Sequence, residues 1–323
     1  MTLCLSEADI RAVLPMGDLI AAMETALAAF SSGQVVQPVR PVVEMGKAAL
    51  FAAMPGFVRD PAVLGAKLVA VIGANQARGL PTHRACILLI DPETGALIAL
   101  MDGRLITEMR TAAVSAVSTK YMARADAAVL AILGSGVQAR SHLEALALWR
   151  VFPEVRVWSP TPEHLRRFAT DSPAPVRACG SAAEAVRGAD VVVLATAASA
   201  PVIEDAWVAT GAHVISVGAC RPTEREMDPA LVARARVVVD SRASAFQESG
   251  DIVLGLREGR FAPSHVVAEL GEVVSGGVPG RTADSEITVF KSLGLAVEDL
   301  AAAHLAYQRA RNLGKGIEID LGG

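Results

Sequence analysis

The sequence has few aromatic residues, no strong excess of charge of either sign and no long apolar run. Aromatic residues make up 4% of the 323 residues, charged residues 20% and hydrophobic residues 52%, which is typical of a folded globular chain. A net charge of −4 does not favour a nucleic-acid partner. The longest apolar stretch, 191–203, contains Thr196, Ser199 and Pro201 and is shorter than the roughly 20 residues of a membrane span. We expect a soluble protein without a membrane partner.

Cysteine is also scarce, and its spacing is uninformative for metals. None of the cysteines belongs to a CxxC pair, so the sequence predicts neither a metal site nor a disulfide framework. We expect reduced thiols in the cytoplasm. Glu7 and Asp9 stand where a signal peptide would be apolar, which agrees with that location. The cysteines are Cys4, Cys86, Cys179 and Cys220.

The first third predicts helices followed by a mostly antiparallel sheet. Ser6 is expected to cap a helix over 7–14, and helical spacing after Asp18 ends at Gly33. Short β-like runs follow at 41–43, 49–53, 65–72, 85–90 and 96–101. The turns expected between them are Gly46, Pro55–Gly56, 73–75 and 91–95. The runs on either side of 91–95 predict a hairpin.

After an expected helix over 106–123, apolar runs alternate with helical segments. The runs lie at 128–133, 155–158, 190–195, 213–217 and 237–239, and this alternation predicts a doubly wound parallel sheet in an α/β protein. We expect a Rossmann dinucleotide-binding domain over 121–290. A final helix from Lys291 to Arg311 is expected to return to the first domain. Residues 1–120 and 291–323 would then form a discontinuous α+β domain.

The strongest motif is a GxGxxA sequence between a strand and a helix. Gly134 permits a tight turn, Gly136 lets the backbone approach a pyrophosphate, and Ala139 lets the helix pack on the strand. The helix N-terminus then offers N–H groups to the phosphates. The residues expected to bind the cofactor are Gly134, Ser135, Gly136, Val137 and Gln138, with Thr196, Val217 and Gly218 after later strands.

The choice of dinucleotide depends on the end of the second strand. An NAD enzyme usually has an acidic residue there to bind the ribose hydroxyls, but this strand ends in Ser159-Pro160-Thr161. The hydroxyls of Ser159 and Thr161, with Arg166 or Arg167, are candidates to bind a 2′-phosphate. They could instead cap the next helix. We favour NADPH, with NADH as the alternative.

Several strings along the chain resemble the ornithine cyclodeaminase and mu-crystallin family. The glycine turn is one of them, and the matches keep the family's order from the first helix to the last. The others are Gln37-Pro38-Val39-Arg40, Gly65-Ala66-Lys67-Leu68, Met101-Asp102-Gly103, Arg110-Thr111-Ala112-Ala113, Glu248-Ser249-Gly250-Asp251, Glu269-Leu270-Gly271-Glu272 and Val289-Phe290-Lys291-Ser292-Leu293-Gly294. The resemblance implies a Rossmann domain and a second domain through which two copies pair as a homodimer.

The resemblance also assigns three cations to a small α-imino or α-amino acid substrate. Arg40 and Arg110, the latter expected to open a helix, can bind its carboxylate through the guanidinium fork. Lys67 lies inside an apolar run, where a charge needs a partner unless the strand is at an edge and the ammonium reaches water. We expect a partly desolvated Lys67 to have a lowered pKa, which would let it exchange a proton near neutral pH. The alternative is an imine that arrives already protonated.

Several further residues are candidates for the site. Glu248 could stabilise an iminium cation or be a solvated carboxylate, and His83 could be catalytic or a packing residue. Leu293 is expected to line the pocket, and Asp299 matches a family position without an assignable role. The resemblance aligns Cys220 with the aspartate of true cyclodeaminases, and a neutral thiol cannot replace that carboxylate. Cys220 is therefore expected to be a small pocket wall.

These features predict an NAD(P)H-dependent ketimine reductase in proline or related amino-acid metabolism. It would reduce Δ1-pyrroline-2-carboxylate or Δ1-piperideine-2-carboxylate to L-proline or L-pipecolate. One alternative is an ornithine cyclodeaminase or an oxidoreductase of the alanine dehydrogenase type. Another is a non-catalytic protein that binds NADPH and a small ligand. The full set of three cations favours catalysis.

Overall fold

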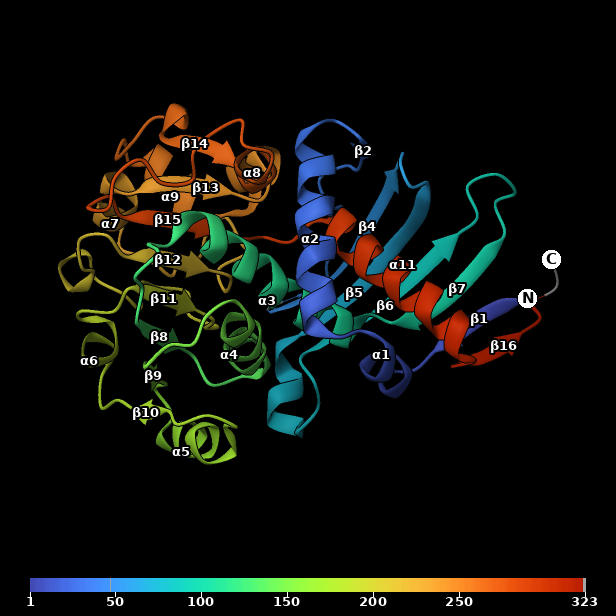
Figure 1. Ribbon diagram of the computed structural model, residues 1–323, viewed down its shortest axis with the longest axis horizontal. Helices are drawn as coiled ribbons and strands as arrows, with labels where there is room; N and C mark the ends of the chain where they lie inside the picture. Colours follow the sequence, from blue (N-terminus) through green and yellow to red (C-terminus); the bar gives the residue numbers. More distant parts are fainter. Residues whose placement is uncertain (47, 322–323) are drawn as a thin grey trace. The chain divides into compact units, whose positions relative to one another are not determined.

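A computed structural model describes residues 1–46 and 48–321. The chain divides into two compact units, each with its own sheet (Figure 1). The first unit consists of Met1–Arg110 and Leu295–Gly323, and the second of Thr111–Gly294. Helix α3 (Gly103–Met122) begins in the first unit and ends in the second.

The first unit contains a mixed sheet with strand order β16-β1-β7-β6-β5-β4-β2, and β3 pairs with β4. The pairs β4–β5, β5–β6 and β6–β7 are antiparallel, so the expected hairpin around 91–95 is confirmed. Ser6 caps α1 in a capping box with Asp9. The elements are β1 (Thr2–Leu5), α1 (Glu7–Val13), α2 (Met16–Ser31), β2 (Val35–Val36), β3 (Val42–Glu44), β4 (Ala49–Val58), β5 (Val63–Ile72), η1 (Gly73–Arg78), β6 (His83–Ile90), β7 (Leu97–Asp102) and β16 (Ile317–Ile319).

Helix α11 (Ala296–Leu313) packs on β4, β5 and β6 beside α2 (Figure 1). Two glycines allow this approach. A Cβ on Gly65 would lie 2.8 Å from the Leu300 side chain, and one on Gly56 would lie 3.2 Å from it. The turn expected at Pro55–Gly56 is therefore wrong, because β4 continues through both residues and uses Gly56 for packing.

The described residues of the second unit form an eight-stranded parallel sheet, as the sequence predicts. The strand order is β10-β9-β8-β11-β12-β15-β13-β14, with most strand residues fully buried. The elements are β8 (Val129–Leu133), α4 (Val137–Trp149), β9 (Glu154–Trp158), α5 (Pro162–Asp171), β10 (Arg177–Ala178), α6 (Ala182–Val186), β11 (Val191–Leu194), η2 (Asp205–Trp207), β12 (His213–Ser216), α7 (Pro229–Arg234), β13 (Arg236–Val239), α8 (Arg242–Glu248), α9 (Gly250–Arg257), η3 (Pro263–His265), β14 (Val266–Glu269), α10 (Leu270–Val274) and β15 (Thr288–Lys291).

The order of this sheet reverses between β8 and β11. From β8 the chain proceeds outward through β9 and β10, then returns to the other side of β8 as β11. Ligands of open α/β sheets bind outside the carboxyl ends of the strands at such a reversal. The GxGxxA turn directly follows β8, so the fold places this motif where a dinucleotide is bound in comparable sheets.

Two expected helix boundaries are wrong. Lys291 does not begin the last helix: it ends β15, and α11 starts at Ala296. The buried run Thr288–Lys291 pairs with β12 and β13, and that pairing outweighs its helical spacing. Arg110 does not open a helix either, because α3 begins at Gly103. Asp102 provides the reason, since its side chain accepts the Leu105 N–H and so caps the helix start.

No single helix among the described residues is long and apolar enough to cross a bilayer. Helices α1 and α2, bent by 88°, reach those limits only as a pair, by length and composition.

Candidate functional site

The turn after β8 has the geometry that phosphate binding requires. Gly134 has φ of +124°, and a Cβ there would lie 2.3 Å from the carbonyl oxygen of Ala195, so this position requires glycine. A Cβ on Gly136 would meet nothing within 4 Å, so the backbone faces open space. Gly136 is also the N-cap of α4 and has no side chain with which to cap it. The N–H groups that begin α4 therefore fit a dinucleotide pyrophosphate.

The hydroxyls expected at the end of β9 do not act as helix caps. Thr161 is the N-cap of α5, but its side chain makes no capping hydrogen bond. The hydroxyl of Ser159 instead accepts a hydrogen bond of 2.9 Å from Ser135 of the glycine turn. Ser159 therefore links the second strand to the proposed phosphate loop.

The other expected cofactor residues meet at a buried glutamate that the sequence did not single out. Glu226 is fully buried, and its carboxylate accepts hydrogen bonds from the backbone N–H groups of Thr196 and Gly218, at 3.0 and 2.8 Å. Val217 lies between Ser216 and Gly218 in the same loop. No local pattern marks Glu226, because it lies in an irregular segment among other charged residues.

Lys67 is the centre of the charged cluster in the first unit. It lies on β5 between Met54 of β4 and Ile87 of β6, both buried. The lysine itself is only 2% exposed, so the edge-strand alternative, with the ammonium in water, is wrong. Burial lowers the pKa of Lys67 to about 8, and the nearby charges of Arg110 and Arg40 act in the same direction.

A carboxylate of α11 joins two of the three expected cations. Asp299 lies 2.5 Å from Lys67 Nζ through Oδ2 and accepts a hydrogen bond of 3.0 Å from Arg110 Nε through Oδ1. Glu298 accepts a second hydrogen bond from Arg110, 2.7 Å from Nη1. Burial opposes the ionisation of Asp299, but Arg110 and Lys67 hold its pKa below the ordinary value. The sequence assigned no role to Asp299, and the structure places it in contact with both Lys67 and Arg110.

The cluster joins cations to carboxylates. Lys67 and Arg110 contact Asp299 and Glu298, and the nearby charge of Arg40 lowers the pKa of Lys67. Ammonium and guanidinium groups are the ones that bind a ligand carboxylate. Arg40 is half-buried between β2 and β3.

His83 belongs to the same face of the sheet. It stands opposite Val71 of β5, in the pleat that also presents Lys67. Burial lowers the pKa of His83 to about 4, and Lys67 and Arg110 contribute to that shift. His83 is therefore a neutral imidazole near pH 7, which makes it a hydrogen-bonding group there and not a cation.

Gln37, in the motif that also contains Arg40, contacts the helix that carries Asp299. Its side-chain oxygen accepts a hydrogen bond of 2.9 Å from the N–H of Val297, at the start of α11. Leu295 is the N-cap of that helix, and its apolar side chain cannot accept a hydrogen bond from the backbone N–H groups there. Gln37 thus fixes the first turn of α11, which carries Glu298 and Asp299. Acidic residues in a first turn are also favoured by the helix dipole.

The other expected pocket residues belong to the second unit. Glu248 ends α8, Leu293 follows β15 and is 5% exposed, and Cys220 follows β12. The thiol of Cys220 donates a hydrogen bond of 3.5 Å to the carbonyl of Val217. It therefore contacts the loop that carries the expected cofactor residues. Val137 and Gln138 lie in the first turn of α4.

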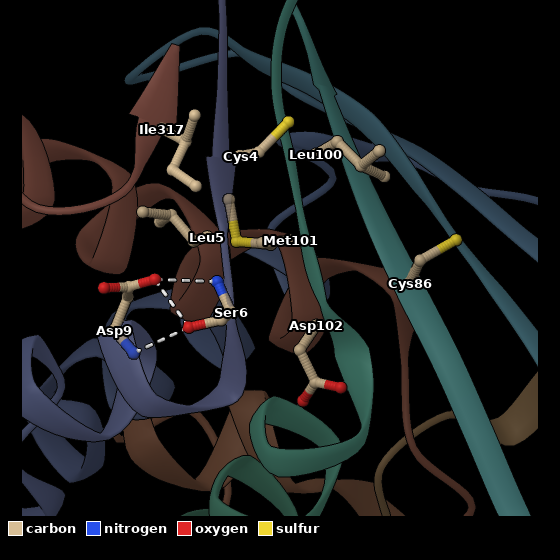
Figure 2. Close-up of a pocket in the computed structure, with 9 residues that line it drawn as sticks. All are labelled: Cys4, Leu5, Ser6, Asp9, Cys86, Leu100, Met101, Asp102 and Ile317. Carbon is tan, nitrogen blue, oxygen red and sulfur yellow. Dashed lines mark hydrogen bonds between the residues drawn. The ribbon is translucent and has the colours of Figure 1, made fainter. Parts of the chain in front are cut away.

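A cavity of about 550 Å³ lies elsewhere in the first unit (Figure 2). Strands β1, β6 and β7 contribute Cys4, Cys86 and Leu100 to its wall. Its polar residues Ser6 and Asp9 are hydrogen-bonded to each other in the capping box of α1. Lys67, Arg110 and Arg40 are not among its lining residues. We therefore place the candidate substrate site at the charged cluster instead.

The chain is similar to known proteins over most of its length. The profile of the Ornithine cyclodeaminase/mu-crystallin family matches residues 1–314. The ketimine reductase mu-crystallin of Rattus norvegicus is 46% identical over 293 residues, which cover 90% of this chain and 91% of that protein. The chain therefore belongs to the ornithine cyclodeaminase/mu-crystallin family.

Solved structures give the same result for the fold. The Δ1-pyrroline-2-carboxylate reductase of Thermococcus litoralis, in complex with NADH and L-proline, matches with a TM-score of 0.96 and 38% identity. The match covers 98% of this chain and 100% of that one. An archaeal alanine dehydrogenase dimer with bound NAD has a TM-score of 0.94 and 32% identity, over 99% of both chains. The expected combination of a Rossmann sheet with a second domain is confirmed.

Proposed function

We propose that this chain is an NAD(P)H-dependent reductase of small cyclic α-imino acids. The buried cluster of Lys67, Arg110 and Asp299 carries the proposal, because it brings together an ammonium and a guanidinium group, which bind carboxylates, and the charge of Arg40 lies close enough to lower the pKa of Lys67. The curated and solved relatives include a ketimine reductase and a Δ1-pyrroline-2-carboxylate reductase. The proposed substrates are Δ1-pyrroline-2-carboxylate and Δ1-piperideine-2-carboxylate, and the products are L-proline and L-pipecolate.

The roles of the side chains follow from their chemistry. Arg40 and Arg110 hold the substrate carboxylate, since a guanidinium can bind both of its oxygens. Lys67 donates a hydrogen bond to the carboxylate or to the imine nitrogen. With a pKa of about 8, it can also supply the proton that the nitrogen gains as the C=N bond becomes C–N. Glu248 remains a candidate to stabilise the positive charge of a protonated imine.

A nicotinamide dinucleotide supplies the hydride when bound. The residues proposed to hold it are the glycine turn, Thr196, Val217 and Gly218, with Ser159 and Thr161 at its ribose. The absence of an acidic residue after β9 supports NADPH, while the solved relatives named above contain NADH and NAD. The two units would then be the substrate and cofactor domains.

Cys220 argues against cyclisation of a diamino acid. We propose that it occupies the position of the cyclodeaminase aspartate. A neutral thiol that donates to a backbone carbonyl cannot serve as a carboxylate base. An oxidoreductase of the alanine dehydrogenase type is the second candidate, supported by the 32% identical archaeal neighbour.

We also propose that the chain is a homodimer, formed through the first unit. On β5, the apolar residues Leu64, Ala66 and Leu68 alternate with the buried row that includes Lys67, and they remain partly exposed. An apolar sheet face of this kind is typical of a surface that pairs with another copy. Sedimentation equilibrium tests this: a monomeric mass at micromolar concentration would contradict it.

A substrate screen tests the function directly. NADPH and NADH oxidation would be followed with each cyclic imino acid, with pyruvate plus ammonia and with pyruvate plus methylamine. We expect the highest kcat/KM with a cyclic imino acid. A preference for pyruvate with ammonia would favour the alanine dehydrogenase candidate, and dinucleotide binding without turnover of any substrate would contradict both.

A further inference from the structure

The buried charges of the second unit are not used by the proposed chemistry. Glu226 is fully buried in the segment between β12 and α7. Its Oε1 accepts from the N–H and the hydroxyl of Thr196, at 3.0 and 2.7 Å, and its Oε2 accepts from the hydroxyl of Ser216 and the N–H of Gly218, at 2.9 and 2.8 Å. Both oxygens therefore accept a backbone N–H. Burial raises the pKa of Glu226, and the charge of Lys291 and these hydrogen bonds oppose that shift.

Lys291 and Asp251 close this network on the other side. Lys291 donates a hydrogen bond of 3.0 Å to Ser216 and lies 3.4 Å from a carboxylate oxygen of Asp251. Asp251 in turn accepts the backbone N–H groups of Glu226 and Met227, each at 3.0 Å. The network therefore fixes both the side chain and the backbone of Glu226.

The groups held by Glu226 lie at the ends of adjacent parallel strands. Thr196 follows β11, Ser216 ends β12 and Lys291 ends the next strand, β15. This is the edge of the sheet outside which ligands of α/β folds bind. Packing here is tight, since a Cβ on Gly218 would lie 2.1 Å from the Thr196 carbonyl oxygen and 2.2 Å from Glu226 Oε1.

We propose that Glu226 is a positioning residue for the dinucleotide: its carboxylate holds the loops of Thr196 and Gly218 in the conformation that binds the cofactor. The inference rests on the proposed function for the identity of that ligand. Glu226 itself contacts the two loops, and its effect on binding passes through them.

The Glu226→Gln substitution tests this because it keeps the size of the side chain. A glutamine has one acceptor oxygen, so the N–H of either Thr196 or Gly218 would face an amide donor and lose its partner. We expect the dissociation constant for NADH or NADPH to rise about tenfold, measured by quenching of nucleotide fluorescence without substrate. The KM for the imino acid, at saturating dinucleotide, should change less than about threefold.

Glu224→Gln is the matched control. Glu224 lies two positions earlier and forms a surface ion pair of 3.6 Å with Arg221. The dinucleotide affinity of the Glu224→Gln protein should therefore remain that of the wild type. A folded Glu226→Gln protein with wild-type affinity would overturn the inference, and so would a loss of imino-acid binding as large as the loss of dinucleotide binding.

Gly218→Ala provides a second test, which decides the matter if Glu226→Gln does not fold. The added methyl group would lie 2.1 Å from the Thr196 carbonyl oxygen and 2.2 Å from Glu226 Oε1, so the contact between the Gly218 loop and the Glu226 carboxylate must change. We expect a similar loss of dinucleotide affinity, and unchanged affinity in a folded variant would contradict the inference. Normal cofactor binding without imino-acid turnover in the wild type would contradict only the proposed function, and wild-type protein that binds no dinucleotide would overturn both.

Discussion

Both units bury charged side chains, but they neutralise them in different ways. In the first unit, Lys67 and Arg110 are paired with Asp299 and Glu298, and the charge of Arg40 lies close enough to lower the pKa of Lys67. In the second unit, Lys291 is paired with Asp251. The Glu226 carboxyl there accepts backbone N–H groups and hydroxyls, and burial raises its pKa.

The difference indicates which cluster is prepared for a ligand. Backbone N–H groups bind the side chains of Glu226 and Asp251, so donors of the protein itself occupy their oxygens. The ammonium and guanidinium groups of the first unit are the ones that suit an anion brought from outside. We therefore expect substitutions in the first unit to act on the imino acid and those in the second to act on the dinucleotide.

The largest effect is expected from Arg110→Ala. Removing the guanidinium takes away a charged partner of the substrate carboxylate and leaves Asp299 and Glu298 without it, so kcat/KM should fall by about 1,000-fold. Stability should also fall by about 3–5 kcal/mol, because a buried ion pair is broken. Steady-state kinetics measure kcat/KM, and urea unfolding measures the free energy of unfolding. A kcat/KM within threefold of the wild type would remove Arg110 from the site.

Lys67→Met should reduce kcat about 100-fold while leaving dinucleotide affinity within about threefold. Methionine has a similar length and suits the apolar neighbours Met54 and Ile87, but it has no proton to donate. The comparison of kcat with the NADH dissociation constant decides the assignment. Equal losses of kcat and of dinucleotide affinity would place Lys67 at the cofactor. They would contradict the assignment of the substrate to the first unit and of the cofactor to the second.

Asp299→Asn should change the pH profile as well as the rate. Burial lowers the pKa of Lys67 to about 8, and the charge of Asp299 opposes that shift, so removing the charge should lower this pKa further. If the reaction requires protonated Lys67, the activity is present at low pH and is lost as the pH rises through the pKa of Lys67. We expect kcat to fall about tenfold and its alkaline limb to move to lower pH. An alkaline limb at the wild-type position would show that another group sets it.

The most selective effect is expected from Ser159→Asp, which places an acidic residue after β9. A carboxylate there favours the ribose hydroxyls of NADH and repels a 2′-phosphate, so the ratio of kcat/KM for NADPH to that for NADH should fall about tenfold. The KM for the imino acid should be unaffected. A change confined to the imino acid would contradict the assignment of the second unit to the cofactor.

The alternation of strands and helices and the GxGxxA turn were predictable from the sequence because both depend on local patterns. The position of Lys67 was not, since an apolar run with one lysine fits an edge strand as well as a central one. Only the pairing of β5 with β4 and β6 decided it. The position of Lys291 was not predictable either. Its local spacing fits a helix, and only the pairing of β15 with β12 and β13 makes it the end of a strand.

The sequence by itself determined the class of fold, the glycine turn and the identity of three cations. The tertiary structure alone showed how charge is compensated. Asp299 lies far along the chain from Lys67 and Arg110 yet touches both, and Glu226 joins the ends of two strands. The physical reason is that periodicity and turn geometry act between neighbours in sequence, whereas the partner of a buried charge is selected by packing.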